Sequence, residues 1–127
     1  MSKITIGKVL TQQKIKRGWL VGHFLPSSSP FKDEKVEIYY KTFKTGDKSD
    51  RLHLHPKGKE YLVVISGKAI MRIGEKKVIL QKGDYVAIPN NTPDKIVKVL
   101  KKFTIMGIRY PSVPNNKIML EQHDNNR

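Results

Sequence analysis

Residues 46–67 read GDKSDRLHLHPKGKEYLVVISG, and this stretch governs the interpretation of the whole 127-residue chain. His53 and His55 are two positions apart, so both imidazoles leave the same face of an extended strand. The Pro-Lys-Gly sequence at 56–58 favours a turn that brings Glu60 back beside the two histidines. Two imidazoles and one carboxylate on a rigid wall form a metal site with open positions, and this ligand set suits several transition metals.

Short strand-like segments surround this stretch. Apolar, aromatic and β-branched residues dominate residues 18–25, 36–43, 60–65, 68–73, 77–80, 85–88, 96–100 and 103–110. Turn-forming groups separate these segments, including PSSSP at 26–30, SG at 66–67 and PNNTP at 89–93. The pattern predicts an antiparallel sandwich or barrel. Helical periodicity is weak throughout, and only residues 115–127 are considered for a short helical turn that ends in a frayed polar tail.

The histidine pair and its surroundings resemble the first sequence motif of the cupin superfamily. His53, His55, Glu60 and Gly67 follow this motif in order and spacing, whereas Gly46 lies one position further upstream than is usual. This motif is fairly specific, and the resemblance extends over roughly residues 36–110.

The second cupin motif is degraded. Gly83 and Pro89 match it, but Asn91 replaces a glycine and Asp94 stands where the family has a histidine. Asn at the glycine position is tolerable because Asn enters left-handed conformations more readily than most residues.

The resemblance implies an all-β, antiparallel jelly-roll barrel that forms a single domain over residues 1–127. Its parts would be a core at about 36–110, N-terminal strands within 4–25 and a polar C-terminal tail at about 115–127. The resemblance also implies a divalent metal ion (Fe, Mn, Ni or Zn) in the mouth of the barrel. The expected ligands are His53, His55, Glu60 and Asp94.

The role of Asp94 has three interpretations. Asp94 is the fourth ligand, or it lies beyond the metal as a second-sphere partner or general base, or its presence abolishes metal affinity. Arg51 shares the strand parity of His53 and His55, so it is a candidate clamp for an anionic substrate group. An exposed position at the strand end is the competing explanation for Arg51.

Two functions fit these features. The first is a small metal-dependent enzyme that acts on a carboxylate or sugar-like substrate, as a dioxygenase, an isomerase or a lyase. The second is a non-catalytic ligand-binding or regulatory cupin, which the degraded second motif favours. Fold alone does not choose between them.

Composition bears on partners and location. The formal net charge is +14, but the 20 lysines are dispersed and are not interleaved with aromatic residues, so specific nucleic-acid binding is not expected. The chain has no cysteine, no signal-like N-terminus and no apolar run of about 20 residues, which favours the cytoplasm and no membrane partner. Residues 60–65 are apolar on both strand faces beyond Glu60, which predicts a covered outer face and a homodimer.

Overall fold

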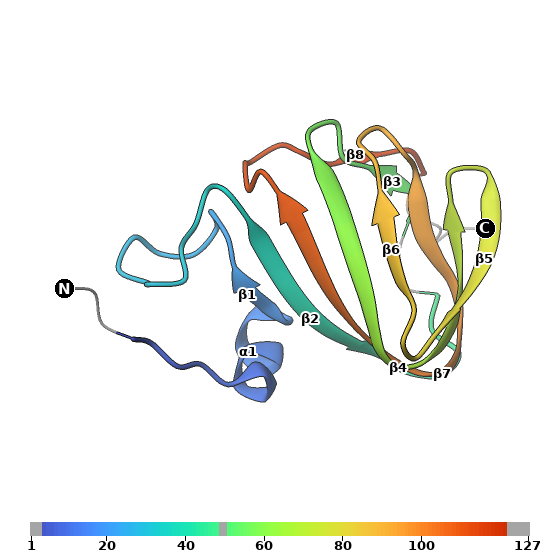
Figure 1. Cartoon of the computed structure of the whole chain (residues 1–127), viewed down its shortest axis with the longest axis horizontal. Coiled ribbons are helices and arrows are strands. Elements are labelled where there is room, and N and C mark those ends of the chain that lie inside the picture. Colours follow the sequence, from blue (N-terminus) through green and yellow to red (C-terminus); the bar gives the residue numbers. More distant parts are fainter. Residues whose placement is uncertain (1–3, 49–50, 122–127) are drawn as a thin grey trace.

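The computed structural model describes residues 4–48 and 51–121. Its elements in chain order are α1 (Val9–Lys16), β1 (Trp19–Val21), β2 (Glu37–Phe43), β3 (His53–Leu54), β4 (Lys59–Ile73), β5 (Lys76–Gln81), β6 (Tyr85–Ile88), β7 (Asp94–Tyr110) and β8 (Ile118–Met119). The paired strands are antiparallel and form one curled sheet, which wraps into a half-barrel (Figure 1). The prediction of an antiparallel β fold is therefore confirmed.

The long strand β7 organises the sheet. It pairs with β2, β3 and β4, so it connects both sides of the curl. The sequence suggests two strands here, 96–100 and 103–110, but the structure has one strand from Asp94 to Tyr110. Lys101 and Lys102 are both exposed where the pairing of β7 with β4 shifts register, so their polarity marks an irregularity within the strand and not a turn.

The turn expected at residues 66–67 is a bulge within β4. The first half of β4 pairs with β6 and the second half with β5, and the register against β7 shifts around Ser66 and Lys68. Gly67 has φ 87°, and an added Cβ would lie 1.9 Å from the carbonyl oxygen of Lys102. Only glycine fits both this conformation and this close approach. The bulge redirects the strand from one part of the curl to the next.

The N-terminal region differs from the strands expected within residues 4–25. Residues 9–16 form helix α1, and the only strand of this region is the short β1. The helix buries none of its residues. The amides of Gln12 and Gln13 instead donate hydrogen bonds to the carbonyl oxygens of Trp19 and Tyr40. A helix attached through polar groups shows no apolar periodicity, which is why the sequence pattern missed it.

The C-terminal region also differs from expectation. The helical turn considered within residues 115–127 is absent from the described part, where Ile118–Met119 form β8 and pair with β3. The Glu121 carboxylate accepts a hydrogen bond from the backbone N–H of Leu52 and forms an ion pair with Lys95. Residues 122–127 lie outside the described residues.

The apolar core fills the inside of the curl. Its most deeply buried side chains come from β4 and β7 and include Leu62, Val64, Ile96, Val99 and Phe103.

No helix in the described ranges meets the length and apolarity that a membrane span requires.

Replacing Gly67 with alanine tests the bulge. Gly83 has nearly the same φ, 92°, but no atom lies within 4 Å of its added Cβ, so Gly83→Ala serves as a matched control. We expect Gly83→Ala to lower the free energy of unfolding by about 1 kcal/mol and Gly67→Ala by about 3 kcal/mol or more, because only Gly67 meets backbone. Urea denaturation measures both, and equal losses would contradict the close approach.

Candidate metal and ligand site

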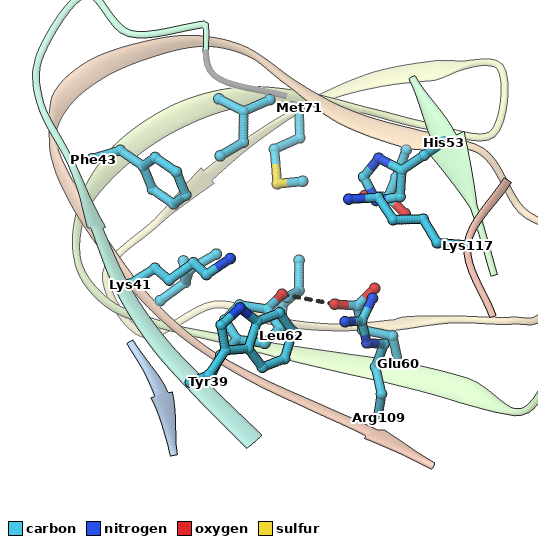
Figure 2. A pocket seen from close by; sticks show the side chains of 13 residues that line it. Tyr39, Lys41, Phe43, His53, Glu60, Leu62, Met71, Arg109 and Lys117 are labelled. Atoms are coloured by element: carbon cyan, nitrogen blue, oxygen red, sulfur yellow. Dashed lines mark hydrogen bonds and ion pairs between the residues drawn. The ribbon is translucent and has the colours of Figure 1, made fainter. Parts of the chain in front are cut away.

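A pocket opens on the inner face of the curl beside the apolar core, and the core residues Leu62, Met71 and Ile96 line it (Figure 2). Its cavity volume is about 60 Å³. The lining residues are Trp19, Tyr39, Lys41, Phe43, His53, Glu60, Leu62, Met71, Asp94, Ile96, Ile105, Arg109 and Lys117. The pocket therefore combines an apolar floor with a rim of ionisable side chains.

Both predicted histidines are buried and fixed by backbone carbonyl groups. The Nδ1 of His53 lies 2.8 Å from the carbonyl oxygen of Arg51, and the Nδ1 of His55 lies 2.6 Å from that of Asn116. A carbonyl oxygen only accepts hydrogen bonds, so each Nδ1 carries the proton and donates. In the neutral imidazole each Nε2 is then left with a lone pair, as a metal ligand requires.

Two buried carboxylates face these lone pairs. The Nε2 of His53 lies 3.6 Å from Asp94 Oδ1, and the Nε2 of His55 lies 3.9 Å from Glu60 Oε1. The sheet register explains one approach directly, since His53 on β3 pairs with Asp94 on β7. All four residues that the sequence singled out thus lie in one buried cluster. Their role as metal ligands remains a prediction.

Tyr39 holds the Glu60 carboxylate in place. Its hydroxyl donates a hydrogen bond of 2.7 Å to Glu60 Oε2. Burial, with the Glu60 charge next in importance, raises the pKa of Tyr39 well above its usual value, so the phenol keeps its proton. Gly107 lies opposite Tyr39 on β7, and its missing side chain leaves room for the ring, which an added Cβ would meet at 2.0 Å.

Arg109 on β7 contributes a cation to the same cluster. Its Nη1 donates to the Nε2 of His55, and its Nη2 lies 3.2 Å from the Oε2 of the buried Glu37. Burial, followed by the charge of Arg109, lowers the pKa of His55 to about 3. His55 is therefore a neutral imidazole. The lone pair of its Nε2 accepts a hydrogen bond from Arg109.

The donor atoms of these residues are those that a divalent metal ion prefers. In the structure, however, they do not converge on one point. Neutral imidazole nitrogens and carboxylate oxygens suit Fe(II), Mn, Ni or Zn. Among residues 4–48 and 51–121, however, no three His, Asp or Glu side chains converge closely enough to hold one ion as they stand. The donors form two histidine–carboxylate pairs, and an ion on His55 Nε2 would have to displace Arg109.

Arg51 does not lie in the pocket. It is exposed and absent from the lining, and only its carbonyl group contributes, as the acceptor for His53. β3 begins at His53, so the strand parity that placed Arg51 beside the histidines does not extend back to it.

Three other cations line the pocket, and the sequence analysis missed them. Lys41 alternates with Tyr39 on the inner face of β2, and Arg109 alternates with Gly107 on that of β7. Strand parity would have placed Lys41 and Arg109 inside once the inner face was known. Lys117 precedes β8, a strand that the sequence did not indicate.

Comparisons with known proteins agree with this architecture. A family profile described as "Cupin domain" matches residues 39–97. No curated protein matches the chain significantly.

Solved structures share the fold at low sequence identity. A cupin protein from Bacteroides fragilis is 21% identical, with 70% of this chain and 72% of that chain covered and a TM-score of 0.56. The DMSP lyase DddQ from Ruegeria pomeroyi is 19% identical, with 80% and 49% covered and a TM-score of 0.66, so this chain spans about half of it. Pac13, a nucleoside dehydratase from Streptomyces, is 12% identical, with 71% and 72% covered and a TM-score of 0.62. These structures fit a jelly-roll.

Tyr39→Phe tests the support of Glu60. The substitution removes one buried hydrogen bond to a carboxylate, and we expect it to lower the free energy of unfolding by about 1.5–3 kcal/mol. Tyr40→Phe changes the neighbouring residue on the other strand face and is expected to have a much smaller effect. Chemical denaturation compares the two variants, and a neutral Tyr39→Phe would contradict the role assigned to the hydroxyl.

Proposed function

The chain belongs to the cupin superfamily, and from this premise we propose that it is a small metal-dependent enzyme acting on a small polar substrate. His53, His55, Glu60 and Asp94 would hold one divalent ion, which is Fe, Mn, Ni or Zn. The bound ion would supply Lewis-acid or dioxygen chemistry.

The tautomers of the two histidines are the observation that carries this proposal. Carbonyl groups fix both Nδ1–H groups, so both Nε2 atoms point their lone pairs toward buried carboxylates. Metal-binding histidines are typically oriented by such a second hydrogen bond. Leaving two imidazoles and two carboxylates buried together without a ligand has no evident structural benefit, because desolvating charged groups is costly.

The chain's own residues would divide the remaining work. Tyr39 keeps Glu60 oriented. Asp94 would either complete the donor set or hold the proton that the reaction moves. The apolar floor of Leu62, Met71 and Ile96 would exclude water from the reacting group.

The similar structures share the fold of this chain and do not select a reaction. Two of them are described as a lyase and a nucleoside dehydratase. Their low identity supports only the shared fold, so the reaction class of this chain, whether dioxygenase, isomerase or lyase, stays open.

A non-catalytic ligand-binding cupin is the second candidate, and Arg109 favours it. Its guanidinium already occupies the lone pair of His55 that a metal needs, and Glu37 holds it there. If this contact persists in solution, the pocket is a metal-free binding site.

Elemental analysis of the purified protein separates the two candidates. We expect near-stoichiometric divalent metal in the wild type and an affinity reduced by more than about 100-fold in His53→Ala, because a direct ligand matters more than an outer-sphere partner. Loss of metal in Asp94→Asn would identify Asp94 as a ligand, whereas retention of metal with loss of activity would identify it as the proton-transfer group.

His23→Ala is the matched control for this experiment. His23 lies outside the pocket lining, and its Nδ1 lies 2.8 Å from the hydroxyl of Ser112, so its loss should leave the metal content unchanged. A wild type without metal, even after incubation with divalent ions, would contradict the metalloenzyme and leave the ligand-binding module.

We also propose that the protein forms a homodimer through the outer apolar face of the sheet. This face consists of Tyr61, Val63 and Ile65 on β4, Tyr85 on β6, and Met106 and Ile108 on β7, which pair across the strands. Tyr85 is 82% exposed, and Tyr61 and Ile65 are 38% and 37% exposed. The six side chains of this face are uncharged, although the chain has 25 lysines and arginines, and Lys59 borders them with its Nζ 5.9 Å from the Tyr61 ring. A mainly apolar face suits a second copy better than nucleic acid, which would require a cluster of basic residues.

Tyr85→Lys tests this interface. We expect the wild type to have twice the chain mass in light scattering, and the lysine to weaken the dimer by at least about tenfold because it buries a charge on the two-fold-related face. Ile118→Lys changes an exposed isoleucine on β8 and should leave the mass unchanged. A monomeric wild type at high protein concentration would contradict the dimer.

Cytoplasmic residence remains a prediction from the sequence.

A further inference from the structure

Three cationic side chains from separate parts of the chain meet in the pocket. Lys41 comes from β2, Arg109 from β7, and Lys117 from the segment before β8. We propose that the ligand of this pocket is a small dianion whose oxygens are bound by Arg109 and Lys117, with Lys41 nearby over the Trp19 and Tyr39 rings. This inference rests on the proposed function, because it names the substrate class of the same site.

Lys117 is the clearest sign of an anionic ligand. Its ammonium reaches into the pocket beside His53 (Figure 2). Within residues 4–48 and 51–121 it has no hydrogen bond or ion pair, whereas the nearby carboxylates already face other groups. Asp94 faces His53, Glu60 accepts from Tyr39, and Glu37 pairs with Arg109. An ammonium directed into a cavity is a ready site for an oxyanion.

Arg109 brings a second cation to the cavity, and each of its terminal nitrogens has one N–H beyond its present contact. Glu37 and His55 hold its two terminal nitrogens, and the ring centroid of Trp19 lies 5.3 Å from its Cζ. Lys41 lies over the other part of this wall, with its Nζ 4.6 Å from the Trp19 ring and 5.1 Å from the Tyr39 ring. The aromatic wall therefore positions two cations beside the cavity.

Charge balance points to a dianion. The three cations of the pocket are matched by three carboxylates, those of Glu37, Glu60 and Asp94, so their formal charges cancel. The divalent ion of the proposed function would add two positive charges to a poorly solvated site. A ligand with two negative charges restores neutrality, and burial of unbalanced charge is costly.

The size of the cavity limits the ligand. Its volume of about 60 Å³ is far below the roughly 300–1,000 Å³ of pockets that enclose drug-sized molecules. A dicarboxylate of a few carbon atoms or inorganic phosphate is the appropriate scale, and both match a guanidinium fork.

The only tryptophan of the chain provides the readout, since Trp19 lines the pocket. Oxalate and inorganic phosphate are titrated separately into metal-stripped protein and into protein reloaded with Zn²⁺, with Trp19 emission and calorimetry as signals. We expect saturable binding of at least one anion, tighter after reloading. We expect no binding of oxamide, the uncharged analogue of oxalate.

The variants assign the binding to the cations. Lys117→Gln and Arg109→Lys should each weaken anion binding by at least about tenfold, because the first removes a charged hydrogen bond and the second removes the paired N–H donors of the planar guanidinium. Lys76→Gln removes the same charge from the exposed end of β5 and should have no effect. Near-ultraviolet circular dichroism checks that each variant keeps its fold.

The outcomes separate this inference from the proposed function. Absent binding, or binding that is equal in wild type and Lys117→Gln, overturns the dianion site even if the protein holds metal. Binding that needs Zn²⁺ and ignores both cations also overturns it, because the metal alone would then hold the anion. Anion binding that Lys117→Gln weakens, in a protein that takes up no metal, supports an anion site at these cations, contradicts the metalloenzyme and overturns the charge-balance argument for a dianion.

Discussion

The antiparallel register between β4 and β7 sets the positions of the groups in the pocket. It places Glu60 opposite Arg109 at one end of the ladder and Ile73 opposite Asp94 at the other. β7 also pairs with β3, which sets His53 against Asp94, and with β2, which sets Tyr39 against Gly107. A slip of one residue between β4 and β7 would turn every inward side chain of the slipped strand outward. Such a shift would therefore remove residues of both the core and the site from the inner face.

The buried polar groups impose a second constraint on this frame. Glu37, Glu60 and Asp94 are each no more than 6% exposed. Arg109 pairs with Glu37, the Tyr39 hydroxyl donates to Glu60, and Asp94 faces the imidazole of His53. Removing one partner of such a pair typically costs about 3–5 kcal/mol, since the remaining charge stays buried. The pocket is thus a set of interdependent pairs, and its geometry is specified by these pairs as much as by the apolar floor.

The sequence predicted the frame and the centre of the site better than its rim. The spacing of His53, His55 and Glu60 identified the cluster because strand parity and one turn suffice to bring these residues together. Asp94 required the family pattern, since its contact with His53 depends on pairing across the sheet. For Arg51 the competing explanation, an exposed position at the strand end, agrees with the structure, because strand parity does not extend before His53. Helix α1 and β8 escaped detection because polar hydrogen bonds and a two-residue strand leave no periodic signal.

The features missed at the rim are those that distinguish this chain within its fold. Imidazoles and carboxylates suit a divalent ion, whereas Arg109, Lys41 and Lys117 suit an anion, and the two sets share one small cavity. The lone pair of His55 Nε2 binds either a metal ion or the N–H of Arg109, but not both. Metal binding at this nitrogen therefore requires the hydrogen bond from Arg109 to break. The guanidinium thus released would lie beside the same cavity with one hydrogen-bonding edge available. Metal binding and oxyanion binding would then both favour the arrangement in which Arg109 has left His55. Each ligand would therefore raise the affinity for the other.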